Sequence, residues 1–308
     1  MEHQLPTAVL GRTGLTVTRL GYGAMEIRGS RIWGGRPVTD AQAQTILNAV
    51  VDAGINFIDT ANDYGRSEEF IGQYLSHCRS QYYLATKCGC HVVRRDEHTD
   101  DTPHIWTKEN LFRGLHESLR RMKTDYVDVM QLHNPTVPQS EEQRVVETLQ
   151  EMQAQGKVRW LGISTTLPHL PTYLQRGVFD LFQIPYSALE RAHEDWITRA
   201  AERGIGIVIR GGVARGEPGV GLGGSARWQV FEAARLDDLR EQGESRTAFL
   251  LRFTLTHPHA HTIILGTLHS EHLQENLQAV SRGPLSPEVY AEAKRRLEAV
   301  GVQAAAVS

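Results

Sequence analysis

A repeated order of helix, glycine and strand constrains this chain more than any other feature of its sequence. Short apolar runs rich in β-branched residues alternate with amphipathic segments of helical length, almost from end to end. Gly54, Gly156 and Gly204 each stand between a helical segment and an apolar run. Glycine suits these places because it adopts the left-handed C-cap conformation at little cost. The runs are apolar on both faces, which is typical of parallel strands covered by helices.

The number of these runs predicts the fold class. With helices between them, eight strands favour an α/β fold that is a single (β/α)8 TIM barrel over an open sheet. Residues 8–17 predict an N-terminal β-hairpin, and residues 286–300 predict an extra C-terminal helix. Because no linker divides the chain, we expect one domain over residues 1–308. The predicted strands are Thr18–Tyr22, Gly54–Asp59, Tyr82–Lys87, Tyr126–His133, Val158–Thr165, Leu181–Tyr186, Ile205–Arg210 and His261–Gly266.

Two helix starts carry the spacing of a capping box. Thr39 precedes Gln42, and Ser140 precedes Gln143, by the three residues that let each side chain bond the other's backbone N–H. Both pairs therefore predict the first turn of a helix.

Composition excludes several classes of partner. Lys and Arg number 33 against 36 Asp and Glu, a net charge of −3 without a block of like charge, so nothing indicates binding to nucleic acid or an anionic membrane. No apolar run approaches the roughly 18 residues of a membrane span. Met1–Pro6 does not read as a signal peptide, and three cysteines do not form a disulfide framework. We expect a cytoplasmic protein that acts on a small molecule; its oligomeric state stays open.

Reactive side chains stand at the ends of three successive predicted strands. These are Asp59, Lys87 and His133, and Tyr64 follows Asp59 by five residues. In a barrel, the carboxyl ends of the strands face one site. A lysine ammonium lowers the pKa of a neighbouring tyrosine, Asp59 can hold Lys87 in place, and His133 can donate a hydrogen bond to a substrate oxygen. The set predicts a proton donor for a carbonyl group.

Six motifs in sequence order carry a resemblance to a known family. They cover residues 54–69, 85–87, 128–133, 156–164, 183–186 and 266–276. From about Leu10 to Leu285 the chain resembles the aldo-keto reductase superfamily. The resemblance implies a TIM barrel that binds a nicotinamide cofactor without a Rossmann domain. It also implies that Tyr64 is the general acid, that Asp59 and Lys87 tune it, and that His133 orients the carbonyl.

The same resemblance assigns residues to the cofactor. NADP(H) is slightly favoured over NAD(H), although Leu268, His269 and His272 stand where an Arg or Lys commonly binds the 2'-phosphate. Neutral histidines can still donate hydrogen bonds there. The implied contacts are Gly23, Met25, Asp59, Ser164, Thr165, Gln183, Arg210, Gly211, Gly212, Val213, Gly216, Gly266, Thr267, His272, Glu275 and Asn276, with Glu275 and Asn276 opening the last barrel helix.

Other features allow simpler interpretations. Asp59 and Lys87 could form only a buried ion pair, with Tyr64 a packed aromatic. The segment Cys88–His91 offers soft ligands, but without a second cysteine pair we expect no metal site. Trp33 and Trp106 are candidates to line a substrate pocket. His257, His259 and His261 alternate before the last strand and predict a solvated loop.

These features lead to one main functional hypothesis and two alternatives. The main one is an NAD(P)H-dependent oxidoreductase that reduces an aldehyde or ketone to an alcohol, with Tyr64 as the general acid. The second is an NAD-linked sugar or alcohol dehydrogenase that acts in the oxidative direction. The third is a barrel that senses the cofactor and acts through a partner protein, against which the intact set of Asp59, Tyr64, Lys87 and His133 argues.

Overall fold

The computed structural model of the chain describes residues 4–307. Within these residues, parallel strands close into an eight-stranded barrel in the order β10-β11-β12-β3-β4-β5-β8-β9, which confirms the predicted fold class. Each predicted run overlaps one barrel strand, and the largest difference is at β4, which begins at Phe57. The barrel strands are β3 (Leu20–Gly23), β4 (Phe57–Asp59), β5 (Tyr83–Cys88), β8 (Val127–His133), β9 (Val158–Ser164), β10 (Leu181–Pro185), β11 (Gly206–Arg210) and β12 (Thr262–Leu265).

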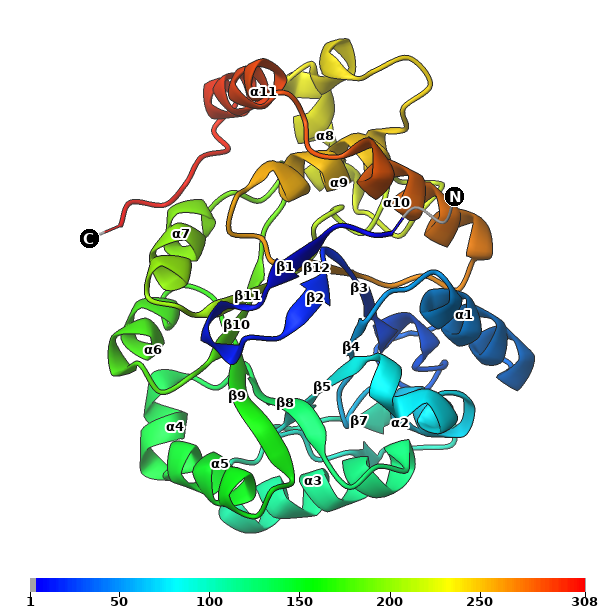
Figure 1. Cartoon of the computed structure of the whole chain (residues 1–308), viewed down its shortest axis with the longest axis vertical. Helices are drawn as coiled ribbons and strands as arrows, with labels where there is room; N and C mark the ends of the chain where they lie inside the picture. Colours follow the sequence, from blue (N-terminus) through cyan, green and yellow to red (C-terminus); the bar gives the residue numbers. More distant parts are fainter. Residues whose placement is uncertain (1–3, 308) are drawn as a thin grey trace. The chain divides into compact units, whose positions relative to one another are not determined.

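Helices follow the barrel strands along the chain (Figure 1). No helix within residues 4–307 is both long enough and apolar enough to cross a membrane. Residues 1–3, on which part of the signal-peptide prediction rests, and residue 308 lie outside the described residues. The helices are α1 (Asp40–Asp52), α2 (Ser67–Tyr74), α3 (Lys108–Met122), α4 (Val137–Glu142), α5 (Val145–Ala154), α6 (Leu170–Arg176), α7 (Glu194–Glu202), α8 (Ser225–Ala233), α9 (Arg246–Thr256), α10 (Ser270–Arg282) and α11 (Pro287–Ala299).

The chain forms two compact units. The first, which we call the β4 unit, comprises Gly21–Phe182 and Gly266–Ser270. In it, β3, β4, β5, β8 and β9 pair in parallel, and every residue of β8 is buried. Figure 1 shows α2, α3 and α5 outside these strands, and α3 packs on β5 while α5 packs on β9. Because β8 is buried along its whole length, its polar residues Asp128, Gln131 and His133 need partners inside the protein.

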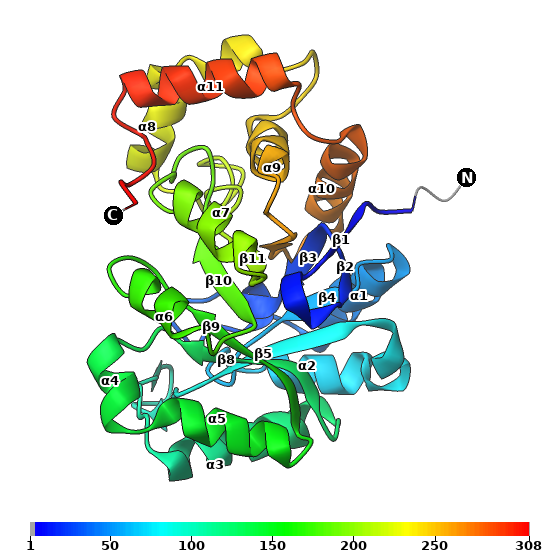
Figure 2. The same cartoon turned by 60° about the vertical axis from the view of Figure 1, so that its left-hand side comes forward.

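The second unit, called the β11 unit, comprises Met1–Leu20, Gln183–Leu265 and Glu271–Ser308. Its hairpin pairs β1 (Thr7–Val9) with β2 (Thr16–Thr18) in antiparallel register around the short helix η1 (Gly11–Thr13). Gly11 has a φ of +52°, and a Cβ there would overlap the backbone of Gly206, so this position requires glycine. Figure 2 shows α11 beside α8, and the short helix η4 (Leu236–Leu239) contacts both.

One predicted helix start is confirmed and the other is wrong. Thr39 and Gln42 form a complete capping box at α1. Ser140 lies inside α4, where its hydroxyl donates to the Val137 carbonyl at 2.8 Å. The box at α4 is formed instead by Thr136 and Gln139, which have the same spacing and are followed by a proline in the first turn.

Candidate active site

Three neighbouring strands of the β4 unit bring predicted catalytic residues to one edge. Asp59 ends β4, His133 ends β8, and Lys87 is the second-last residue of β5. The parallel register places Lys87 beside Gln131 and His133 beside Ser164. Because parallel strands end at the same edge of a sheet, these side chains meet there.

Asp59 and Lys87 form a buried ion pair. The Lys87 Nζ donates to the Asp59 Oδ2 at 2.6 Å and to the Thr60 carbonyl at 2.8 Å, and only 1% of the Lys87 side chain is exposed. Gln131 Nε2 donates to the other Asp59 oxygen at 2.7 Å. Burial is the largest influence and acts to lower the pKa of Lys87, but Asp59, Tyr64 and Asp63 together outweigh it and the pKa is raised. Lys87 is therefore held as an ammonium at neutral pH.

Tyr64 lies in the loop after β4, against this ammonium. The Lys87 Nζ is 4.9 Å from the centre of the Tyr64 ring, within the range of a cation–π contact. Burial raises the pKa of Tyr64 to about 12; Lys87 opposes this shift, while Asp59 and Asp63 add to it. The predicted lowering of the Tyr64 pKa by Lys87 is thus present but outweighed, because the sequence does not show how deeply the phenol is buried.

His133 has two partners that the sequence analysis missed. Its Nδ1 lies 3.0 Å from the Cys90 Sγ and 3.5 Å from the Asp63 Oδ1. Burial is the largest influence and acts to raise the pKa of Asp63, but His133, Cys90 and Lys87 together outweigh it and lower that pKa. The Tyr64 ring lies edge-on to the imidazole at 6.0 Å. With Nδ1 occupied by these contacts, Nε2 is the ring nitrogen left for a substrate oxygen.

Sequence signals for the missed residues differ. Asp63 directly precedes Tyr64, and Gln131 stands two residues before His133, on the same face of β8. Both were open to prediction from the motifs. Cys90 lies in the segment Cys88–His91 that offered soft ligands, but His104 offered no signal, because the two meet only through an isolated antiparallel bridge across a loop.

The two candidate pocket tryptophans both lie in the β4 unit. Trp33 is 51% exposed and packs edge-on to Tyr64 with ring centres 5.9 Å apart. Trp106 is buried and stacks on His104 at 5.6 Å, and the His104 ring lies edge-on to His133 at 5.5 Å. Trp33 thus borders the tyrosine, and Trp106 is separated from His133 by one ring.

Seven of the residues assigned to the cofactor belong to the β4 unit, including Met25 and Thr165. At Gly266 a Cβ would lie 2.6 Å from the Gly23 carbonyl oxygen, so the two backbones require glycine to approach this closely. The Ser164 hydroxyl donates to Asn134 Oδ1 at 2.8 Å, an amide that the sequence analysis did not single out. Tyr22 donates to the Thr267 carbonyl at 3.0 Å.

The remaining assigned residues belong to the β11 unit. Gln183 is buried on β10, Arg210 ends β11, and Val213 follows in the loop. Gly211 and Gly216 have φ values of +71° and +80°, the conformation that favours glycine. The Gly212 carbonyl accepts a hydrogen bond from Thr254 at 2.8 Å.

The last barrel helix differs from the prediction. It begins at Ser270, so Glu275 and Asn276 lie in its middle rather than opening it. Glu275 is exposed, while Asn276 and His272 are half-buried. Glu271 lies in the first turn of this helix, where a negative charge is favourable, so the helix begins before the residues that the family motif singles out.

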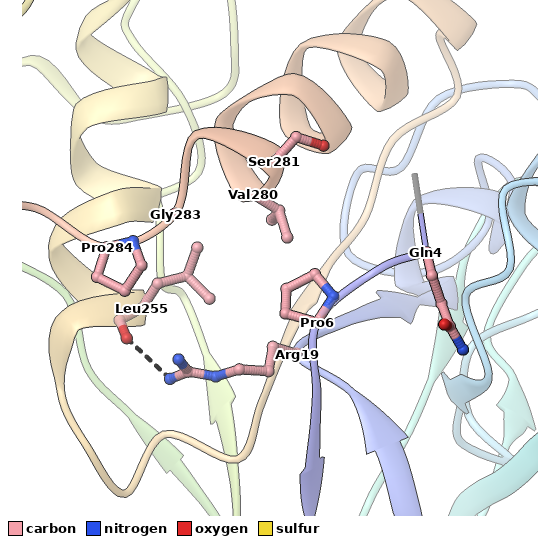
Figure 3. Close-up of a pocket in the computed structure, with 8 residues that line it drawn as sticks. All are labelled: Gln4, Pro6, Arg19, Leu255, Val280, Ser281, Gly283 and Pro284. Carbon is pink, nitrogen blue, oxygen red and sulfur yellow. Dashed lines mark hydrogen bonds between the residues drawn. The ribbon is translucent and has the colours of Figure 1, made fainter. Parts of the chain in front are cut away.

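A separate pocket of about 270 Å³ lies in the β11 unit (Figure 3). Arg19 lines it, but its guanidinium donates to the carbonyls of Leu255 at 2.8 Å and Ala260 at 3.0 Å. Because the guanidinium already donates its hydrogen bonds to backbone carbonyls, Arg19 is poorly placed to bind an anion in this pocket. None of the lining residues is a predicted site residue: Gln4, Pro6, Arg19, Leu255, Val280, Ser281, Gly283 and Pro284.

Comparisons with known proteins agree with the resemblance. The model of the aldo/keto reductase family matches residues 19–217. The chain is 28% identical over 299 residues to the oxidoreductase YqkF of Bacillus subtilis, covering 91% of this chain and 92% of that protein. It is 33% identical over 215 residues to the NADH-specific methylglyoxal reductase of Escherichia coli, covering 65% and 64%. The holo form of aldo-keto reductase AKR11C1 from Bacillus halodurans matches with a TM-score of 0.82 and 27% identity over 95% and 96% of the two chains.

Proposed function

Because the chain belongs to the aldo/keto reductase family, we propose that it reduces an aldehyde or ketone to an alcohol with NAD(P)H, and that Tyr64 is the general acid. The observation that carries this proposal is the buried Lys87–Asp59 pair, with its ammonium 4.9 Å from the centre of the Tyr64 ring. An ion pair with a purely structural role does not require a tyrosine beside it. A tyrosine that donates a proton does require a neighbouring ammonium, because the ammonium stabilises the phenolate that remains after proton transfer.

Tyr64 holds its proton until the substrate needs it. With a pKa of about 12, the phenol is protonated at neutral pH and can give its proton to a substrate oxygen that becomes an alkoxide. Lys87 then faces a phenolate, and Asp59 keeps the ammonium in place through its 2.6 Å bond. His133 donates a hydrogen bond from Nε2 to the same oxygen and so orients the carbonyl.

The reduced nicotinamide, when bound, supplies the hydride. The residues of the β4 unit suit such a group, because Gly23 and Gly266 leave no side chain where their backbones meet, and Ser164 with Asn134 offers hydroxyl and amide groups for a carboxamide. We propose that Met25, Thr165 and Thr267 contribute here as well. For the β11 unit we propose Gln183 as a further carboxamide contact and Arg210–Val213 with Gly216 as the pyrophosphate contacts, with His272, Glu275 and Asn276 at the adenosine.

Replacing the proton donor tests the proposal. Tyr64→Phe should reduce oxidation of NADPH or NADH by a panel of aldehydes and ketones by at least about a hundredfold, the usual contribution of a general acid. Tyr74→Phe is the matched control, because that tyrosine is half-buried at the end of α2 and its hydroxyl contacts only the exposed side chains of Gln73 and Asp40. Turnover by Tyr64→Phe at the level of the control would remove Tyr64 from the mechanism.

Trp33 and Trp106 are proposed to line the substrate pocket. Trp33 borders the Tyr64 ring, and the stacked His104–Trp106 pair borders His133, so the two indoles lie near different members of the proposed donor set. Flat, amphipathic rings of this kind suit a small carbonyl compound that carries both polar and apolar groups.

A second candidate function is NAD-linked oxidation of a sugar or alcohol. The specific observation in its favour is that residues 268–276 contain no Lys or Arg, the residues that best bind a 2'-phosphate. One of the relatives above is an NADH-specific enzyme. We propose that NADP(H) is still slightly favoured, through the imidazoles of His269 and His272. Titration should give dissociation constants for NADPH and NADH that differ by no more than about tenfold, that is about 1.4 kcal/mol, with NADPH binding more tightly. If NADH instead binds more than about tenfold more tightly than NADPH, the second candidate is supported.

A further inference from the structure

Three metal-ligand side chains converge beside the proposed proton donor. They are Cys90, His104 and His133, and their ligand atoms all lie within 4.8 Å of one another. The Cys90 Sγ and the His133 Nδ1 are 3.0 Å apart. In a tetrahedral zinc site, bond lengths of about 2.3 Å to sulfur and 2.0 Å to nitrogen separate such atoms by about 3.5 Å. A small widening of the Cys90–His133 contact therefore makes room for an ion.

The loop after β5 fixes two of these ligands before any ion arrives. Cys90 and His104 face each other in an antiparallel bridge. Backbone bonds flank the bridge, with His91 N donating to the Pro103 carbonyl at 2.8 Å and Ile105 N donating to the Gly89 carbonyl at 2.7 Å. Because the backbone holds the pair, little ordering remains to oppose binding.

A buried carboxylate lies next to the cluster and pairs with one of its members. Asp63 is fully buried, and its Oδ1 lies 3.5 Å from the His133 Nδ1. Neither Asp63 oxygen has a closer hydrogen-bond partner within residues 4–307. Together with a Cys90 thiolate, this carboxylate places two negative charges at the cluster, which balance a divalent cation.

We propose that Cys90, His104 and His133 form a binding site for a soft divalent transition-metal ion of the Zn²⁺ class, with its fourth position open to water and the Asp63 carboxylate beside His133. One thiolate and two imidazoles are ligands that zinc takes in proteins, and a site with three protein ligands keeps one position for water. His104 is exposed and gives the ion access from solvent, while Cys90 and His133 are buried. The site shares His133 with the proposed reaction but does not use Asp59, Tyr64 or Lys87, and it holds whether or not the proposed function does.

Cobalt substitution tests the site without measuring turnover. The purified full-length chain, stripped of metal with a chelator, is titrated with Co²⁺. The expected spectrum has a thiolate-to-cobalt charge-transfer band and the visible bands of a tetrahedral ion, and these bands should stop growing at one equivalent of Co²⁺. Adding Zn²⁺ should remove all of them, because it displaces the bound Co²⁺. Cys90→Ser should remove the charge-transfer band. His104→Gln replaces an exposed side chain. It should weaken Co²⁺ binding at least about tenfold, because replacing even a residue that only supports a metal ligand lowers metal affinity by about that much.

Matched controls separate ligands from bystanders. Cys78→Ser removes a thiol whose hydrogen bond goes to the Leu75 carbonyl, and His91→Gln removes an imidazole bonded to Asn110; both variants should bind Co²⁺ like the parent chain. Circular dichroism and the melting temperature establish that each variant is folded. A folded parent chain without a charge-transfer band, or a band that survives in Cys90→Ser, would overturn the proposal and leave the cluster as a hydrogen-bond network.

Discussion

The ammonium of Lys87 depends on a single carboxylate. Lys87 is almost fully buried, and its Nζ contacts Asp59 and one backbone carbonyl. Removing one partner of a buried ion pair leaves the other charge uncompensated in a medium of low dielectric constant. The ability of Tyr64 to give up its proton therefore rests on Asp59, although Asp59 is not the group that gives the proton.

Asp59→Asn tests this dependence. The variant keeps the shape of the side chain but removes its charge, so Lys87 should favour its neutral form and no longer stabilise the Tyr64 phenolate. We expect turnover per folded molecule to fall by at least about a hundredfold and the free energy of unfolding to fall by about 3–5 kcal/mol. Steady-state kinetics and urea denaturation measure the two effects.

Asp128→Asn is the matched control for this variant. Asp128 is equally buried and accepts bonds from Arg79 at 2.7 Å, Arg159 at 3.0 Å and the Leu84 N–H at 2.9 Å, near the start of β8. Its loss should also destabilise the fold but leave turnover per folded molecule unchanged. If both variants lose only stability, the Asp59–Lys87 pair is structural and the interpretation of Tyr64 fails.

At the residue scale, the sequence predicted the ends of strands better than the contacts around them. Asp59, Lys87 and His133 were predictable because a parallel strand places its last residue at a known edge. The pairing of Cys90 with His133 was not, because it depends on the direction the chain takes just after β5, where Gly89 has a positive φ. Side-chain burial, which sets the pKa of Tyr64, was likewise invisible, since it depends on neighbours such as Trp33 from distant parts of the chain.

At the scale of elements, the loop after β5 is shaped by one glycine. Gly89 has a φ of +104°, and a Cβ there would overlap the six-membered ring of Trp106. Asn110 braces this loop from α3, donating to the Gly89 carbonyl at 3.4 Å and to the Ile105 carbonyl at 2.6 Å. The position of Trp106, and through it the width of the proposed substrate pocket, is therefore set by the backbone of β5 and its loop.

Gly89→Ala should displace Trp106. Because the added methyl overlaps the indole, the ring must move, and the fold should lose about 1–3 kcal/mol. The KM for a carbonyl substrate should rise severalfold while the melting temperature falls. Gly54→Ala is the control, because Gly54 also has a positive φ, of +79°, but nothing lies within 4 Å of its added Cβ. Equal KM values for the two variants would show that Trp106 does not line the pocket.

Helix starts show where prediction at this scale fails. The capping-box spacing recurs at Thr136–Gln139 and Ser140–Gln143, and a spacing rule alone cannot choose between overlapping candidates. A proline after Thr136 decides the outcome, because proline fits the first turn of a helix but not its interior. Element existence and order were predictable from periodicity, whereas boundaries depended on such local competition.

At the scale of the whole molecule, buried histidines should make the fold sensitive to acid. Burial lowers the pKa values of His257 and His261 to about 4. His257 packs edge-on to Tyr186 at 5.2 Å, and the Ile207 N–H donates to His261 Nδ1 at 2.9 Å. The predicted solvated loop is therefore wrong for His257, which is buried. Alternation before a strand does not distinguish a solvated turn from one covered by neighbouring side chains.

Stability should fall as the pH drops from about 6.5 to about 4. In that window the unfolded chain binds protons at these histidines and the folded chain does not, so protonation favours unfolding; above about 6.5 the contribution is fully present. For His257 the loss between pH 7 and pH 5 is on the order of 1–2 kcal/mol. Urea denaturation at both values measures it, and His257→Gln should reduce the difference. An unchanged difference in that variant would mean that other groups cause the acid sensitivity.

The exposed indole beside Tyr64 also makes the site optically readable. Trp33 is half in solvent and touches the proposed proton donor with its ring edge, so any molecule placed against Tyr64 changes the polarity around this fluorophore. Its emission should shift or be quenched when a cofactor or a carbonyl compound binds, whereas the buried indoles of Trp106 and Trp228 sit in environments that already exclude water. Comparing the parent chain with Trp33→Phe isolates this signal, so occupancy of the site can be followed in real time without an added label.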